Sequence, residues 1–123
     1  MKRNYFFICG CARSGTTALW RLVSAHQEVA VGVERYLRMA RPNKFLLSED
    51  LFEESRFFDL HDTNSKSLPS GKNGKYYQDL KSRYNNCKIF GDKIPRLYDY
   101  YTELNAAFAG MKMEFGFSYR FKL

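Results

Sequence analysis

The sequence predicts an α/β fold, in which a parallel sheet carries helices on its flanks. Short apolar runs suited to buried strands alternate along the chain with segments whose apolar residues recur every three or four positions. The first such run leads through a glycine-bounded loop into a helical segment, which is the beginning of a strand-helix-strand unit. With 123 residues, 45% of them hydrophobic, the chain suffices for one domain with a modest core.

The N-terminal third supplies two expected strands and one helix. The apolar, aromatic run 4–9 (NYFFIC) ends at a glycine and predicts a buried strand, and the run 29–33 (VAVGV) predicts a second one. Between them a helix is expected to begin at Thr16. Its buried face should carry the residues that recur at helical steps: Leu19, Leu22, Val23 and His26.

The rest of the chain continues the alternation. The expected elements, in order, are a helix at 46–58, a helix at 76–84, a strand at 88–90, a helix at 97–108 and the start of a strand at 111–117. The stretch 62–74 is rich in Ser, Asn, Gly and Lys without an apolar period, and it predicts a surface loop.

Charge and composition favour some classes of binding partner and disfavour others, but they do not identify one function. The formal net charge of +7 and a pI of about 9.4 favour an anionic partner, such as a nucleotide, an acidic acceptor or a nucleic acid. The basic residues are scattered, which disfavours a nucleic-acid-binding tail. The three cysteines have neither a disulfide framework nor a zinc spacing, so no metal is expected. The apolar N-terminal run is too short for a signal peptide or membrane span, and a cytoplasmic protein is expected.

The stretch 10–17 (GCARSGTT) carries the strongest functional signal. Gly10 and Gly15 have the spacing of the phosphate-binding Walker A loop, G-x-x-x-x-G-K-[ST]. The backbone N–H groups of such a turn, and the N-terminus of the helix that follows, attract an anion. Thr16 stands where the Walker lysine would be, and the positive charge lies inside the loop at Arg13. This departure disfavours a triphosphate hydrolase and favours a donor with a shorter anionic group.

The segment 6–26 (FFICGCARSGTTALWRLVSAH) resembles the 5′-phosphosulfate-binding segment of sulfotransferases that use PAPS, 3′-phosphoadenosine-5′-phosphosulfate. It is most similar to the branch that includes tyrosylprotein and bacterial sulfotransferases. The resemblance implies a P-loop-like α/β sheet, PAPS as the sulfuryl donor and no metal. It also implies that the donor is held by loop residues Gly10, Arg13, Ser14, Gly15, Thr16 and Thr17.

Two further segments are similar to motifs of the same family. In 24–37 (SAHQEVAVGVERYL), Glu34 matches the glutamate that serves as general base in the tyrosylprotein branch, although Val33 separates it from the glycine that usually precedes it. In 90–101 (FGDKIPRLYDYY), Lys93 matches a lysine that contacts the sulfuryl group or the bridging oxygen. Without the resemblance, either residue would read as an ordinary charge in a surface loop.

The resemblance covers about residues 4–112. The family's next segment, Arg-[DN]-Pro followed by a Ser, grips the 3′-phosphate, and residues 111–123 form an atypical tail without it. We therefore expect residues 1–123 to form a single partial sulfotransferase domain, the half that binds the 5′-phosphosulfate. Its sheet should end after the first few strands and leave an edge exposed.

The predicted function is transfer of a sulfuryl group from PAPS to a hydroxyl or amine acceptor, with Glu34, Lys93 and Arg13 as catalytic residues. An inactive fragment of such an enzyme is one alternative, and a non-catalytic nucleotide- or anion-binding module is a second. A basic nucleic-acid-binding protein is a third, although no recognised motif supports it and no nucleic-acid partner is expected. The acceptor, whether carbohydrate, peptide or small molecule, is not selected by the sequence.

Overall fold

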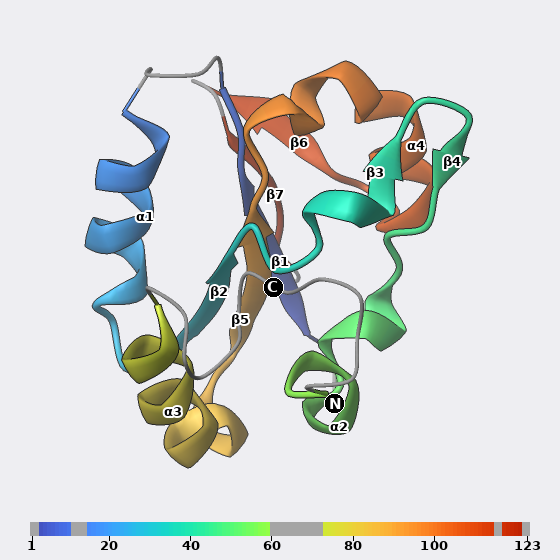
Figure 1. The fold of residues 1–123 in the computed structure, drawn as a ribbon. Coiled ribbons are helices and arrows are strands. Elements are labelled where there is room, and N and C mark those ends of the chain that lie inside the picture. The colour runs from blue at the N-terminus through green and yellow to red at the C-terminus, as the bar shows by residue number, and fades with distance from the viewer. Residues whose placement is uncertain (1–2, 11–14, 60–72, 115–116, 122–123) are drawn as a thin grey trace.

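The computed structural model describes residues 3–10, 15–59, 73–114 and 117–121, with the backbone alone at 113, 114, 117 and 118 (Figure 1). At the centre is a five-stranded sheet in the order β2-β5-β1-β7-β6. Its strands are β1 (Asn4–Ile8), β2 (Val29–Val33), β5 (Ile89–Lys93), β6 (Lys112–Glu114) and β7 (Phe117–Arg120). The helices are α1 (Thr16–Ser24), α2 (Glu54–Phe57), α3 (Gly74–Arg83) and α4 (Tyr101–Ala107).

The α/β class is confirmed, but the sheet is mixed rather than wholly parallel. Strands β2, β5 and β1 run parallel, whereas β7 runs antiparallel to both β1 and β6. Strand β7 pairs with β1 from Tyr5–Arg120 to Ile8–Phe117, so the sheet continues beyond β1. The single strand expected at 111–117 is thus a hairpin of two strands, which extends the sheet beyond β1.

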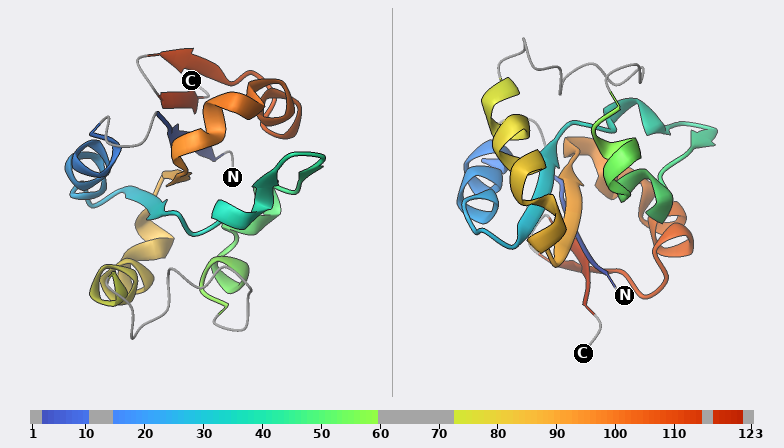
Figure 2. Two further views of the ribbon diagram at one scale, coloured as in Figure 1. Left: turned by 45° about the horizontal axis from the view of Figure 1, so that its top comes forward. Right: turned by 90° about the horizontal axis from the view of Figure 1, so that it is seen from below.

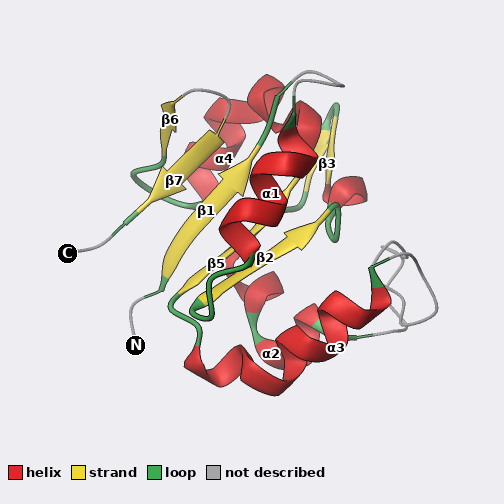
Figure 3. Ribbon diagram, turned by 90° about the vertical axis from the view of Figure 1, so that its left-hand side faces the viewer, coloured by secondary structure: helices red, strands yellow, loops and turns green. Residues whose placement is uncertain are grey.

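Helices flank the sheet on both faces (Figures 1 and 2). Helix α1 lies against one face, while α4 and the small hairpin of β3 (Ala40–Arg41) and β4 (Lys44–Phe45) lie on the other side. Helix α3 lies beside the edge strand β2 (Figure 3). There the hydroxyl of Tyr76 donates to the carbonyl of Val31 at 2.7 Å, and the N–H of Val33 donates to the hydroxyl of Tyr77 at 2.8 Å. These contacts occupy backbone groups that an edge strand otherwise leaves open.

The core between the sheet and α2 is aromatic. Phe52 is fully buried and its ring contacts those of Phe7 and Phe108, with centroids 5.8 and 6.1 Å away. The expected helix at 46–58 is interrupted there: a 3₁₀ helix (Glu49–Phe52) and the short α2 flank Glu53, whose backbone is extended. In one continuous helix Phe52 and Phe57 would point about 140° apart. The break lets both rings enter the same core.

The buried face of α1 matches the predicted one only in part, since Leu19 and Val23 pack against the core as partly buried side chains. Leu22 is 75% exposed, whereas Trp20 and Ser24 are buried. The indole Nε1 of Trp20 donates to the carbonyl of Val31 at 2.8 Å. The indole ring of Trp20 and its N–H donor orient α1 toward β2. The spacing of apolar residues along the helix did not predict this orientation.

Other boundaries shift by small amounts. Strand β2 has the predicted bounds, and the predicted helix at 97–108 is confirmed as a 3₁₀ helix (Pro95–Tyr100) that continues into α4. Further 3₁₀ helices occupy Leu37–Met39 and Tyr84–Asn86. Helix α3 begins at Gly74, the last position of the predicted loop, and residues 62–72 of that loop lie outside the described residues.

Candidate functional site

The topology brings three loops to one edge of the sheet. In register, Lys93 at the end of β5 is the partner of Ile8 at the end of β1 and of Val33 at the end of β2. The chain leaves β1 toward α1 on one face and leaves β5 toward α4 on the other (Figure 1). In open α/β sheets a crevice forms where successive connections depart to opposite faces, and ligands bind there at the carboxyl ends of the strands. That place here lies between the ends of β1 and β5.

Gly10, the first residue of the glycine-bounded loop, lies at this crevice. The N–H of Gly10 donates to the carbonyl of Pro95 at 2.7 Å, which ties the loop after β1 to the loop after β5. Gly15 precedes α1 with a φ of 88°, a left-handed conformation that is strained for residues with a Cβ. Arg13 and Ser14, both predicted to bind the donor, lie outside the described residues. Thr16 and Thr17 open α1.

Three residues that were predicted from separate segments lie together at the crevice. The ammonium Nζ of Lys93 is 3.3 Å from the hydroxyl Oγ1 of Thr17, to which it donates, and 3.8 Å from the carboxylate Oε2 of Glu34. The Lys93 side chain is only 5% exposed, and that of Glu34 is 23% exposed. A buried ammonium is costly unless it is paired, so Glu34 and Thr17 are the groups that make this position of Lys93 tolerable.

Glu34 has an unusual backbone. Its φ is 54°, in the left-handed region that few non-glycine residues adopt. Its N–H donates to the carbonyl of Lys93 at 2.8 Å, which joins the end of β2 to the end of β5. Such strain is tolerated when neighbouring contacts hold the turn in place, and it occurs often at functional sites.

The contacts that hold this turn come from Asp92, a residue with no assigned role in the sequence analysis. Its Oδ1 accepts the N–H groups of Arg35 at 3.1 Å and of Lys93 at 2.9 Å, and its Oδ2 accepts the N–H of Tyr36 at 2.7 Å. Asp92 therefore fixes both the turn that carries Glu34 and the backbone of Lys93. The signal in the sequence was an acidic residue that directly follows the short apolar run at the start of this strand and precedes Lys93.

Asp92 is fully buried, and burial raises the pKa of its carboxyl group to about 7, because three hydrogen bonds only partly offset the loss of hydration. Gly32 on the neighbouring strand leaves room for it. A Cβ at Gly32 would lie 2.9 Å from Oδ1 of Asp92 and 3.1 Å from the hydroxyl of Tyr77. The carboxylate thus occupies space that a side chain on β2 would otherwise take.

A pocket of about 340 Å³ opens beside Glu34, between the segment after β2 and the segment after β5. Its lining consists of Glu34, Leu37, Ala40, Pro42, Ile94, Pro95, Arg96 and Tyr100. Most of these side chains are apolar. The guanidinium of Arg96 is already paired: its Nε and Nη2 donate to Oδ2 of Asp99 at 3.1 and 2.9 Å.

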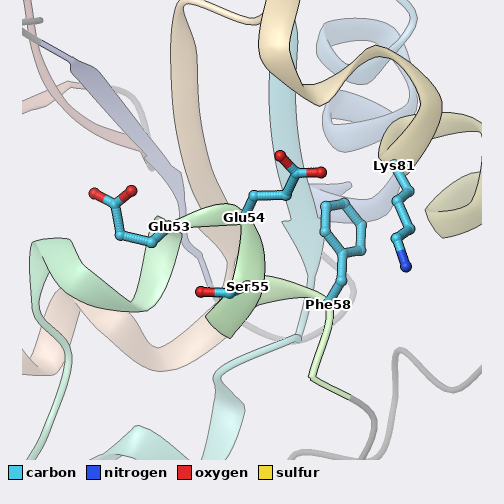
Figure 4. Close-up of a pocket in the computed structure, with 5 residues that line it drawn as sticks. All are labelled: Glu53, Glu54, Ser55, Phe58 and Lys81. Atoms are coloured by element: carbon cyan, nitrogen blue, oxygen red, sulfur yellow. The ribbon is translucent and has the colours of Figure 1, made fainter.

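A second pocket, of about 500 Å³, lies between α2 and α3 (Figure 4). It is lined by Glu53, Glu54, Ser55, Phe58 and Lys81. Both helices lie toward the lower end of the sheet in Figure 1, away from the carboxyl ends of the parallel strands. None of these five residues belongs to the predicted site, and the crevice beside Glu34 remains the candidate functional site.

Comparison with family models, with curated proteins and with solved structures finds no match for this chain. Across the part of the chain that the structure describes, no three His, Cys, Asp or Glu side chains are grouped to hold a metal ion. Within the same ranges no helix is both long and apolar enough to cross a membrane. The function is therefore argued from the geometry of the crevice and from the three segments that meet there.

Proposed function

We propose that this chain is a PAPS-dependent sulfotransferase domain of P-loop-like fold, and that it transfers a sulfuryl group from PAPS to a hydroxyl or amine. The observation that carries the proposal is the contact of Lys93 with both Thr17 and Glu34. Nζ of Lys93 lies 3.3 Å from Oγ1 of Thr17 and 3.8 Å from Oε2 of Glu34. Each belongs to a different segment that resembles a family motif. The parallel strands place the three segments at one edge of the sheet, and the direct contacts of these three side chains at that edge support a common site.

The position of the crevice also supports the proposal. It lies at the carboxyl ends of parallel strands and beside the N-terminus of α1, a nine-residue helix. The partial positive charge of that helix end attracts an anionic group such as a phosphosulfate. Arg13 and Ser14, in the loop before α1, would add a guanidinium and a hydroxyl donor by the same resemblance.

In the proposed reaction the acceptor atom attacks sulfur, and the bond from sulfur to the bridging oxygen of the 5′-phosphate breaks. Negative charge then grows on the equatorial and leaving oxygens, as in phosphoryl transfer. Lys93 and the hydroxyl of Thr17 stabilise this charge from positions that are fixed before the reaction. Glu34 accepts the proton of the acceptor, and 3′,5′-adenosine bisphosphate (PAP) is released.

The ion pair of Glu34 and Lys93 describes the proposed site before PAPS and the acceptor bind. Without the donor, each of the two charges neutralises the other. When the sulfuryl group of PAPS approaches Lys93, the ammonium gains a second anionic partner. The carboxylate of Glu34 then accepts the acceptor proton.

Isothermal titration with PAP tests the donor site. Replacing Lys93 by Ala removes a charge-assisted hydrogen bond worth about 1.5–3 kcal/mol, so affinity should fall about 10- to 100-fold. Lys88→Ala is the matched control, because Lys88 is 70% exposed and precedes the same strand at its opposite end. Equal affinity of both variants and the wild type for PAP would refute the proposed role of Lys93.

The same titration separates the alternatives. PAP or PAPS binding in preference to ATP, without transfer to any acceptor, would favour a non-catalytic nucleotide-binding module. Salt-dependent binding to DNA or RNA with no affinity for PAP would favour the nucleic-acid hypothesis and overturn the proposal.

A further inference from the structure

We infer that the acceptor is a small hydroxyl-bearing arene, a phenol, held in the pocket beside Glu34. The inference rests on the proposed function and names the substrate class of the same site. It is carried by the position, the size and the lining of that pocket.

The pocket adjoins the proposed reacting groups. Glu34 forms part of its wall, Oε2 of Glu34 is 3.8 Å from Nζ of Lys93, and Nζ is 3.3 Å from Oγ1 of Thr17. A line of contacts therefore leads from the pocket to the start of α1. A hydroxyl placed against Glu34 lies next to the group that contacts the sulfuryl donor.

The size and walls fit a compact apolar body. About 340 Å³ lies at the lower end of the range of small-molecule sites. Leu37, Ala40 and Ile94 supply aliphatic walls, and Pro42 and Pro95 supply walls whose backbone is stiff. The ring of Tyr100, held 6.1 Å from the ring of Phe45, offers a face or edge to an aromatic guest.

The same lining disfavours a carbohydrate. A sugar would bring several hydroxyl groups into a pocket whose described walls are mainly apolar. Each buried hydroxyl that lacks a partner costs about 1–3 kcal/mol. A phenol brings one hydroxyl, and the carboxylate of Glu34 is the partner for it.

An acidic peptide is disfavoured by the charge of the pocket. Among the described residues that line it, Arg96 alone is cationic. Its guanidinium already donates twice to Asp99, and its side chain is 81% exposed. An exposed and paired charge adds little affinity for a further carboxylate.

The step balances without a further reactant. The phenolic oxygen forms a bond to sulfur, and the bond between sulfur and the 5′-phosphate oxygen breaks with its electron pair on the phosphate. The phenolic proton passes to Glu34. The products are an aryl sulfate and PAP.

Purified chain is incubated with labelled PAPS and one of three acceptors: 2-naphthol, N-acetylglucosamine, or a tyrosine peptide flanked by glutamates. We expect label in 2-naphthyl sulfate at a kcat/KM at least about tenfold above the other two. Ala40→Trp, which fills the pocket, should lower kcat/KM for 2-naphthol at least about tenfold and leave PAP affinity unchanged. Ala106→Trp, the same change at an exposed position of α4, should leave both unchanged.

Preferred transfer to the sugar or the peptide would overturn the inference and leave the proposed function standing. Wild-type activity of Ala40→Trp toward 2-naphthol would also overturn it. Absence of PAP binding and of transfer to all three acceptors would instead refute the proposed function, and the inference with it. If Ala40→Trp does not fold, the amide shifts of wild type with PAP and 2-naphthol decide: changes at Leu37, Ala40 and Tyr100 support the site, and changes confined to other residues contradict it.

Discussion

Asp92 is the residue whose replacement tests the architecture of the site most sharply. Its Oδ1 accepts two backbone N–H groups and its Oδ2 accepts one. Asn at this position can keep one oxygen in place of Oδ1 and so retain the bonds from Arg35 and Lys93. Its amide NH₂ then faces the N–H of Tyr36, and that bond is lost. Ala loses all three.

The cost follows from the number of bonds. At about 1 kcal/mol net for each hydrogen bond, Asp92→Ala should destabilise the fold by about 3 kcal/mol and Asp92→Asn by about 1 kcal/mol under acidic conditions. The N–H groups of the turn are buried, and in the Ala variant they are left unpaired. The Ala variant should also free the backbone of Glu34 from its left-handed conformation.

The dependence on pH gives a signature that packing alone cannot produce. Burial raises the pKa of Asp92 from 3.8 to about 7 in the folded chain. Between those values the folded chain holds a proton that the unfolded chain has released, so stability falls as the pH rises from about 4 to about 7. The values lie about three pH units apart and each unit costs about 1.4 kcal/mol, which gives a loss of about 4 kcal/mol from this group.

Urea unfolding followed by the fluorescence of Trp20, the single tryptophan, measures this effect. Asn does not titrate, so the Asp92→Asn variant lacks this loss. The free energy of unfolding of wild type minus that of the variant should fall by up to about 4 kcal/mol between about pH 4 and about pH 7. Groups common to both proteins cancel in the difference. A difference that stays constant over this range, or an Ala variant more stable than the Asn variant at about pH 4, would refute the role assigned to Asp92.

Two further changes test the packing around the site. Gly91→Ala places a Cβ 1.7 Å from the carbonyl oxygen of Phe6 on β1, so the two strands must separate. We expect urea unfolding to show at least about 3 kcal/mol of destabilisation. The control Gly110→Ala, where the nearest atom is 3.9 Å from the added Cβ, should lose only about 1 kcal/mol because of its positive φ. Equal costs would contradict the close approach of β5 to β1. Trp20→Phe keeps a ring on α1 but loses the bond to Val31, and thermal unfolding should report about 1 kcal/mol, since the carbonyl of Val31 keeps the hydroxyl of Tyr76. A loss above about 3 kcal/mol would indicate that ring packing rather than the bond is the main contribution.

Glu34 and Lys93 were expected through the family resemblance alone, whereas the strands that bring them together could be predicted from local patterns. The run at 29–33 is apolar throughout and the run at 4–9 is apolar after Asn4, as expected for buried strands, and each ends just before a predicted site residue. The parallel pairing of β2, β5 and β1 then places the residues after those strands at one edge. This is why Thr17, Glu34 and Lys93, predicted separately, lie together.

What could not be anticipated depends on register and on long-range packing. Asp92 holds the turn after β2 only because its strand pairs with Gly32 in a particular register, which no local pattern encodes. The sequence of β7 is that of an ordinary short strand, and nothing in it shows that the strand pairs with β1 in the antiparallel direction. The break before α2 depends on the burial of Phe52 and Phe57 in one core, and the orientation of α1 depends on the burial of Trp20. Helix propensity contains no information on either packing arrangement.

Transfer of labelled sulfate from PAPS by Glu34→Gln is the most direct measurement of the proposed activity. Gln keeps the shape of Glu34 but cannot take the acceptor proton, so the rate should fall about 10²- to 10⁴-fold while PAP affinity changes little. Glu28→Gln is the matched control, because Glu28 lies just before β2 whereas Glu34 lies just after it. Glu28 pairs with Lys88, with 3.5 Å between the charged atoms, at the end of the strands opposite the crevice. Its rate should equal that of wild type. Wild-type transfer by Glu34→Gln, or no transfer by the wild-type chain to any hydroxyl or amine acceptor, would contradict the proposal.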